Sequence, residues 1–171
     1  MTDSVTADTL VFERELDAPR ETVWRYLIDP ELRARWFMGG PTFPQVGGKL
    51  GMTMAHDNLS DEMVPFPERY APHKGKSWTE TITAIDPPRL LAFTWDEGQN
   101  GQVSIELDDL GERTRLTLTH SGIPTREGAV NFGGGWGAHL DVLERRLRGE
   151  HIASFWDLHA KAEARAKAAL L

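Results

Sequence analysis

The C-terminal third of the chain sets the strongest constraint on the fold. Residues 114–120 alternate between polar and apolar side chains, as a half-buried strand does, and a turn with glycine and proline follows at 121–124. After a glycine-rich segment, a helix is predicted to begin at Trp136. Its apolar residues recur at spacings of 4, 3 and 4 positions, at Trp136, Leu140, Leu143 and Leu147. This spacing forms one continuous apolar stripe, so we expect the helix to lie across a sheet.

The rest of the chain supplies that sheet. Five more runs have the alternation or the apolar content of strands, at residues 10–16, 50–56, 76–85, 89–95 and 102–107. Two short helices are predicted after the first strand, one over 19–28 and one that carries Leu32 and Trp36. The almost continuously apolar run 89–95 predicts a central strand covered on both faces. These elements predict an α+β fold in which a curved antiparallel sheet wraps around a long C-terminal helix and leaves room for a cavity.

Length and composition bound the organisation of the chain. A chain of 171 residues with 40% hydrophobic content suits one domain and an appendage, which we expect at 1–150 and 151–171. Residues 57–75 hold three prolines and few apolar side chains, which predicts a long loop. A net charge of -7 disfavours nucleic acid and anionic membranes as partners.

Cysteine content and the start of the chain bear on location. With no cysteine the chain has no disulfide and no thiolate chemistry, which is typical of a reducing compartment. Residues 1–5 lack a basic segment followed by an apolar one, and no run reaches the ~18 apolar residues of a membrane span. We therefore expect a soluble, cytoplasmic protein that does not enter the membrane.

Seven short motifs follow one another in an order that resembles a known family. They are the first strand at 10–16, Ala18-Pro19 with Val23-Trp24, Asp29-Pro30-Glu31-Leu32 with Trp36, Val46-Gly47-Gly48, Ile85-Asp86-Pro87-Pro88-Arg89-Leu90 with Thr94-Trp95, Thr119-His120-Ser121-Gly122-Ile123-Pro124 and Gly135-Trp136. Over about residues 8–149 the chain resembles bacterial proteins similar to the activator of the heat-shock-protein-90 ATPase, within the START-like, SRPBCC superfamily. The resemblance implies a helix-grip fold, a hydrophobic cavity and no shared catalytic set. The segments 57–75 and 150–171 depart from the family pattern.

Large aromatic residues near the predicted cavity are the candidate ligand contacts. A ring at the edge between helix and sheet can either fill the core or form the wall of a pocket, and core packing is the more common role. His120 either caps the turn that follows it, which is the favoured interpretation, or it meets a polar ligand group at the cavity mouth or serves there as a general acid/base near neutral pH. The predicted ligand-binding residues are Trp36, Trp78, Phe93, Trp95, His120, Trp136 and Leu140.

Metal and phosphate sites are not expected. The six histidines include no pair spaced i,i+4 with an intervening acid, so we predict no metal, and no cofactor is predicted either. The run 133–135 lacks the lysine and hydroxyl residue of a phosphate loop. It is interpreted as a flexible hinge that leads into the helix, and the segment 121–135 is predicted to be a gate over the cavity.

The last segment, 150–171, is rich in alanine, lysine and glutamate and predicts another helix. Its apolar patch, formed by Ile152, Phe155 and Trp156, needs a surface to cover it. That surface is either the chain's own domain or, in a homodimer through 151–171, a second subunit.

Three functions remain open at this point. The favoured one is a carrier or sensor that binds a small hydrophobic or aromatic molecule without catalysis. The second is a cochaperone-like module with a chaperone partner and a role in the stress response, which the family resemblance suggests. The third and least favoured is an enzyme of the cyclase or hydratase type that uses one acid/base residue in the same cavity.

Overall fold

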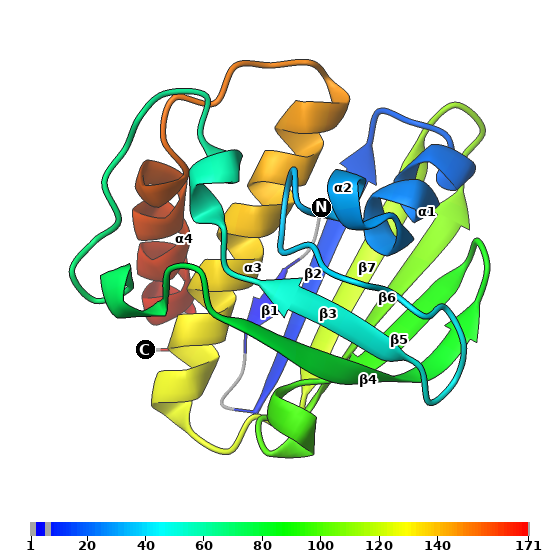
Figure 1. The fold of residues 1–171 in the computed structure, drawn as a ribbon, viewed down its shortest axis with the longest axis horizontal. Coiled ribbons are helices and arrows are strands. Elements are labelled where there is room, and N and C mark those ends of the chain that lie inside the picture. Colours follow the sequence, from blue (N-terminus) through cyan, green and yellow to red (C-terminus); the bar gives the residue numbers. More distant parts are fainter. Residues whose placement is uncertain (1–2, 6–7, 171) are drawn as a thin grey trace.

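The computed structural model describes residues 3–5 and 8–170, and it confirms the α+β fold with a curved antiparallel sheet wrapped around a long helix (Figure 1). Residues 1–2, 6–7 and 171 lie outside the described part, and with them fall parts of the predictions for residues 1–5 and for the last helix. The sheet has seven strands in the order β1-β2-β7-β6-β5-β4-β3. The strands are β1 (Ser4–Val5), β2 (Thr9–Leu16), β3 (Lys49–Thr53), β4 (Ser77–Asp86), β5 (Leu90–Thr94), β6 (Gln102–Asp109) and β7 (Thr114–Ser121). The α-helices are α1 (Arg20–Ile28), α2 (Pro30–Arg33), α3 (Arg126–Leu147) and α4 (Phe155–Ala169).

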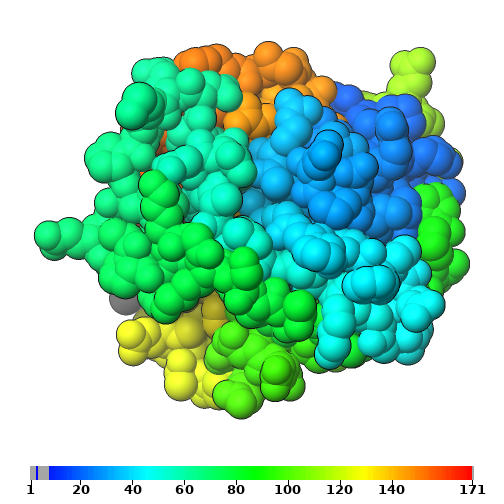
Figure 2. Space-filling model, in the orientation of Figure 1, coloured from blue at the N-terminus to red at the C-terminus, as the bar shows by residue number. Residues whose placement is uncertain are grey.

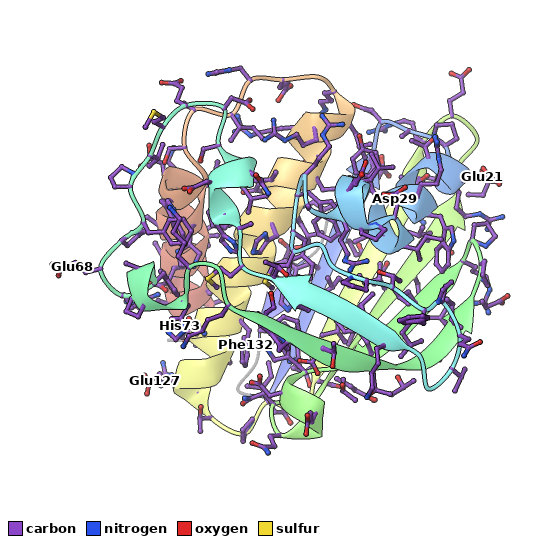
Figure 3. The ribbon with its side chains drawn as sticks, in the orientation of Figure 1. Glu21, Asp29, Glu68, His73, Glu127 and Phe132 are labelled. Carbon is purple, nitrogen blue, oxygen red and sulfur yellow. The ribbon has the colours of Figure 1, made fainter. Side chains whose placement is uncertain are left out.

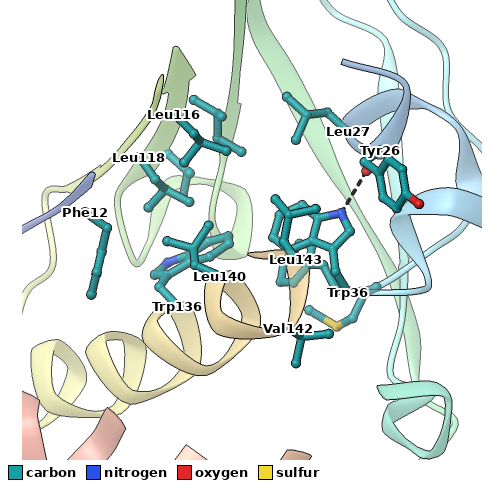
Figure 4. Packing of buried hydrophobic residues seen from close by; sticks show 14 of the residues in the cluster. Phe12, Tyr26, Leu27, Trp36, Leu116, Leu118, Trp136, Leu140, Val142 and Leu143 are labelled. Atoms are coloured by element: carbon teal, nitrogen blue, oxygen red, sulfur yellow. Dashed lines mark hydrogen bonds between the residues drawn. The ribbon is translucent and has the colours of Figure 1, made fainter. Parts of the chain in front are cut away.

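The apolar stripe of α3 lies on the concave face of the sheet, as its spacing predicts. Trp136, Leu140 and Leu143 are buried and face Leu116 and Leu118 of β7 (Figure 4). Alternate residues of β6 complete this layer, because the pleat of a strand turns every second side chain to the same face. The core therefore sits between the sheet and α3.

The expectation that residues 89–95 are covered on both faces is wrong. In β5 the exposure alternates, so that Leu91 and Phe93 are buried while Leu90 and Ala92 are only half-buried. The physical reason is that α1, α2 and α3 all lie on one side of the sheet (Figure 1), which leaves its outer face to solvent.

Helix α3 begins at Arg126, well before the predicted start at Trp136, and its N-terminus is capped by Thr125, whose Oγ1 accepts from the Gly128 N–H at 3.0 Å. Residues 133–135 are therefore inside a helix and are neither a hinge nor part of a gating loop. Tertiary packing outweighs the low helix propensity of glycine here. A Cβ on Gly133 would lie 2.9 Å from the Cβ of Ala166, so the glycine lets α4 approach α3 closely.

Helix α4 packs along α3, and the chain's own domain covers the apolar patch of the last segment. Ile152, Phe155 and Trp156 are all buried. The patch from which the homodimer through 151–171 was predicted is thus enclosed within one chain. Ser154 caps α4 by accepting a hydrogen bond from the Asp157 N–H at 3.2 Å.

The segment 57–75 is a long connection, as predicted, and it covers α4. It contains two turns of 3₁₀ helix, η1 (His56–Leu59) and η2 (Ala71–His73), and no strand. In Figure 2 this segment, coloured teal to green, forms the left side of the molecule, which is where Figure 1 places α4. Asp61 fixes it in place, since its carboxylate accepts from the Ile152 N–H and from the Arg146 guanidinium, each at 2.7 Å.

Arg33 joins the corner of α1 and α2 to β3. Only 2% of this residue is exposed, and burial lowers its pKa to about 10. Its guanidinium donates to the carbonyl oxygens of Leu27, Met38, Gly40 and Gly51 and to Oγ1 of Thr42, at 2.8 to 3.2 Å. The buried cation is therefore satisfied by backbone dipoles rather than by a carboxylate.

Candidate ligand-binding cavity

An apolar cavity of about 130 Å³ lies where α3, α4 and the segment before η2 meet the end of the sheet. Its lining residues come from every one of these elements. They are Phe37, Met38, Met54, His56, Tyr70, Trp95, Asn131, Phe132, Gly135, Trp136, His139, Phe155, Trp156 and His159. None of these fourteen residues carries an acidic or a lysine or arginine side chain. The cavity is thus suited to apolar groups and unsuited to ionic ones.

Aromatic rings form two of the cavity's walls. On the sheet side, the ring of Phe37 lies 4.9 Å from that of Trp136, and Trp95 lies 5.7 Å from Trp136. On the α4 side, Trp156 stacks on His56 at 5.5 Å and on Tyr70 at 5.1 Å. These contacts hold the rings in fixed orientations, so the walls are preformed.

His120 holds one of these walls in place. Its Nε2 donates to the carbonyl oxygen of Asn100 at 2.7 Å, and its Nδ1 accepts from Nε1 of Trp136 at 3.0 Å. Burial lowers the pKa of the imidazole, which favours this neutral form. Both ring nitrogens have partners inside the protein, so the side chain positions the Trp136 indole.

Glu80 gives similar support to the other end of the wall. Its buried carboxylate accepts from Nε1 of Trp78 at 3.0 Å and from the N–H groups of Asp96 and Glu97 at 3.0 and 3.2 Å. Asp96 and Glu97 adopt φ angles of 50° and 55°, which are left-handed values uncommon for residues other than glycine. The carboxylate therefore secures the strained turn that follows Trp95.

The structure separates the predicted ligand contacts into three groups. Trp95 and Trp136 line the cavity. Trp78 and His120 stand behind it, Trp78 with its ring edge-on to Trp95 at 6.5 Å. The other three, Trp36, Phe93 and Leu140, are buried in the core between sheet and helices.

Trp36 lies in the core and does not line this cavity. Its Nε1 donates to the carbonyl oxygen of Tyr26 at 2.8 Å (Figure 4). Only 1% of the residue is exposed. An indole thus buries its apolar face while its N–H finds a backbone partner, as buried tryptophans usually do.

Sequence reasoning missed the five lining residues that come from residues 56–70 and from α4. Tyr70, Phe155, Trp156 and His159 all line the cavity. The apolar patch at Phe155 and Trp156 was visible in the sequence, but nothing in the sequence showed that it faces Trp136 across a hollow.

Three histidines line the cavity, and burial lowers the pKa of each. The pKa of His56 falls to about 4, that of His139 lies well below its usual range, and that of His159 is also lowered. All three are therefore neutral near pH 7. Among the described residues, no group of three or more histidines and carboxylates is arranged to hold a metal ion.

Tyr70 and Asn131 connect the cavity to a more polar surface depression, because both residues line both hollows. The Tyr70 hydroxyl donates to Oδ1 of Asn131 at 3.2 Å and lies 3.4 Å from Nε2 of His159. His73 and Glu127, which border the depression, lie near Phe132 at the same end of α3 (Figure 3). This side is the mouth of the cavity.

Comparison with known proteins identifies the family. Residues 17–148 match the family model described as "Activator of Hsp90 ATPase homolog 1-like protein". The chain belongs to this family. The match ends at the C-terminus of α3, so α4 lies beyond the part that the family model covers.

A solved structure that covers the whole chain extends the comparison to α4. The protein encoded by gene BPP1335 from Bordetella parapertussis is 35% identical, with a TM-score of 0.80 over 100% of this chain and 96% of that one. CalU16 from Micromonospora echinospora is 22% identical, with a TM-score of 0.68 over 95% and 88%. NE0264 from Nitrosomonas europaea is 21% identical, with a TM-score of 0.61 over 83% and 95%. The last two share the fold.

Two further findings add little about activity. No functionally curated protein gives a significant match to this chain. In the part of the chain that the structure describes, none of the helices has the length and apolar character needed to cross a membrane.

Proposed function

We propose that the protein binds a small apolar or aromatic molecule in the cavity between α3, α4 and the end of the sheet, as a carrier or sensor. The observation that carries this proposal is the aromatic, charge-free lining of a hollow of about 130 Å³. Apolar cavities of about 150 Å³ stay dry and accept benzene, so a hollow of this size suits one ring. A larger ligand extends through the mouth at Tyr70 and Asn131.

The expected affinity for a single ring is modest. Burying about 200 Å² of apolar surface at roughly 25 cal/mol per Å² contributes about 5 kcal/mol. That free energy corresponds to a Kd on the order of 0.1 to 1 mM. Tighter binding requires polar contacts or the additional surface at the mouth.

The test uses tryptophan fluorescence and thermal unfolding during titration with toluene, because Trp95, Trp136 and Trp156 surround the cavity. Gly135→Leu is the blocking variant, since Gly135 lines the cavity and a Cβ there meets no atom within 4 Å. Ala164→Leu adds the same side chain on the exposed face of α4 and is the matched control.

Saturable quenching and a raised melting temperature are expected for the native protein and for Ala164→Leu. Gly135→Leu is expected to lose both effects. A native protein that shows no saturable response to any single-ring compound contradicts the proposal, as does unchanged binding in Gly135→Leu.

A second candidate function, an activator-like interaction with an Hsp90-type chaperone, follows from the family match over residues 17–148. A cytoplasmic location and a role in the stress response belong to this candidate. It predicts that the purified protein raises the ATPase rate of the chaperone from the same organism. An unchanged rate, together with no co-sedimentation of the two proteins, argues against it.

A further inference from the structure

His56 is an anomaly in the wall of the cavity. Only 4% of the residue is exposed, and its ring lies 5.1 Å from Phe155 and 5.5 Å from Trp156. Its Nδ1 is buried and has no hydrogen-bond partner among the described residues. Buried polar atoms of native proteins almost always have partners, so an unpaired one requires an explanation.

Its neighbours show that the anomaly is specific to this residue. His139 donates from Nδ1 to the carbonyl oxygen of Trp36 at 2.8 Å, and Nε2 of His159 lies 3.4 Å from the Tyr70 hydroxyl. Both ring nitrogens of His120, behind the wall, are paired. Of the cavity histidines within residues 8–170, His56 is the one with a buried ring nitrogen, Nδ1, that has no hydrogen-bond partner.

The chemistry of a neutral imidazole restricts what can satisfy it. The ring offers one N–H donor and one acceptor nitrogen. Because Nδ1 is fully enclosed by the protein and Nε2 is not, Nε2 is the nitrogen that a ligand in the cavity can reach, and a hydroxyl group pairs with it in either tautomer because its hydrogen rotates. A carboxylate is disfavoured, since no lysine or arginine lines the cavity to compensate its charge. A pure hydrocarbon fits the walls but leaves the imidazole unpaired.

We propose that the ligand is a neutral molecule whose ring carries a hydroxyl group, and that His56 is the specificity-determining residue that hydrogen-bonds this hydroxyl. The inference rests on the proposed function, because it assigns the ligand class of the same cavity. The aromatic walls supply the affinity for the ring, and His56 selects its substituent.

The experiment compares phenol, toluene and benzoate, which share one ring and differ in the substituent. Binding of each to the full chain is measured by calorimetry and by ligand-observed NMR. Phenol is expected to bind about 3 to 10 times more tightly than toluene, because the net free energy of one hydrogen bond raises the affinity by about this factor. Benzoate is expected not to bind measurably.

His56→Phe removes the hydrogen-bonding group and keeps an aromatic ring. It is expected to lower the ratio of phenol affinity to toluene affinity about tenfold or more, so that toluene becomes the better ligand. His151→Phe is the matched control, because the side chain of His151 is 63% exposed and does not line the cavity. This control is expected to keep the native ratio.

The outcomes separate the two proposals. Native protein that binds toluene as tightly as phenol, or His56→Phe that keeps the preference for phenol, overturns the assignment to His56 and leaves the cavity proposal standing. Failure of the native protein to bind phenol and toluene alike overturns both. The comparison of ligands on the native protein decides the matter even if His56→Phe does not fold.

Discussion

The glycines of α3 give a direct test of how the cavity is built, because Gly133, Gly134 and Gly137 lie against α4 and Gly135 does not. A Cβ on Gly133 would lie 2.9 Å from the Cβ of Ala166, and one on Gly137 would lie 3.0 Å from the Cβ of Ala162. A Cβ on Gly135 meets no atom within 4 Å. The substitutions Gly133→Ala and Gly135→Ala therefore make a matched pair in one helix.

The two variants share the change in backbone propensity and differ in packing. Alanine is favoured over glycine inside a helix by about 1 kcal/mol, which applies to both positions. At Gly133 the new methyl group meets a methyl group that cannot rotate away, and overpacking of this kind costs about 1 to 3 kcal/mol. We expect Gly135→Ala to stabilise the protein by about 1 kcal/mol and Gly133→Ala to be neutral or to destabilise it by up to about 2 kcal/mol.

Thermal and urea unfolding measure this difference. For a chain of this size, 1 kcal/mol corresponds to about 2 to 4 °C in the melting temperature. Adding Ala166→Gly to Gly133→Ala removes the clashing methyl group, so the double variant is expected to be more stable than the sum of the two single effects. Equal stabilisation by Gly133→Ala and Gly135→Ala would refute the close packing of α4 on α3.

Three further predictions concern single residues. Arg33→Met leaves the carbonyl groups that Arg33 satisfies without donors, and it is expected to lower the free energy of unfolding in urea by about 3 kcal/mol or more. The control Arg89→Met, at an exposed ion pair with Asp86, is expected to change that free energy by less than about 0.5 kcal/mol. Equal effects of the two substitutions would contradict the role of Arg33. Because burial holds the pKa of His56 near 4 and that of His139 also below its usual range, the stability these neutral groups contribute is complete above about pH 6.5. It is expected to fall as the pH drops toward 4, by about 3 kcal/mol for His56 alone, and an unchanged urea midpoint between pH 7 and 4.5 would exclude this. Asp29→Ala removes the N-terminal cap of α2, in which Oδ1 of Asp29 accepts hydrogen bonds from the N–H groups of Glu31 and Leu32. The substitution is expected to lower the free energy of unfolding, measured by thermal denaturation, by about 1 kcal/mol. A variant as stable as the native protein would show that the cap is dispensable.

The site was less predictable than the fold, and His120 shows the reason. Its position at the end of β7 and beside a turn was readable from the sequence, but whether its nitrogens face a ligand or the protein depends on Asn100 and Trp136. Those partners lie 20 and 16 residues away in the chain. Only Trp95 and Trp136 of the predicted residues line the cavity, and five of its fourteen lining residues come from residues 56–70 and from α4, which carry none of the family motifs.

The sequence by itself determined the layers of this protein. Two local periodicities carry this information: the alternation of apolar and polar residues in β2, β6 and β7, and the apolar stripe from Trp136 to Leu143 on α3. Each places the apolar side chains on one face of its element, and that face is buried in the folded chain. The tertiary structure decided where α3 begins, since glycines that break an isolated helix are tolerated when α4 packs on them. It also decided the cavity, because a hollow forms from what distant side chains leave unfilled, and no local pattern records that quantity.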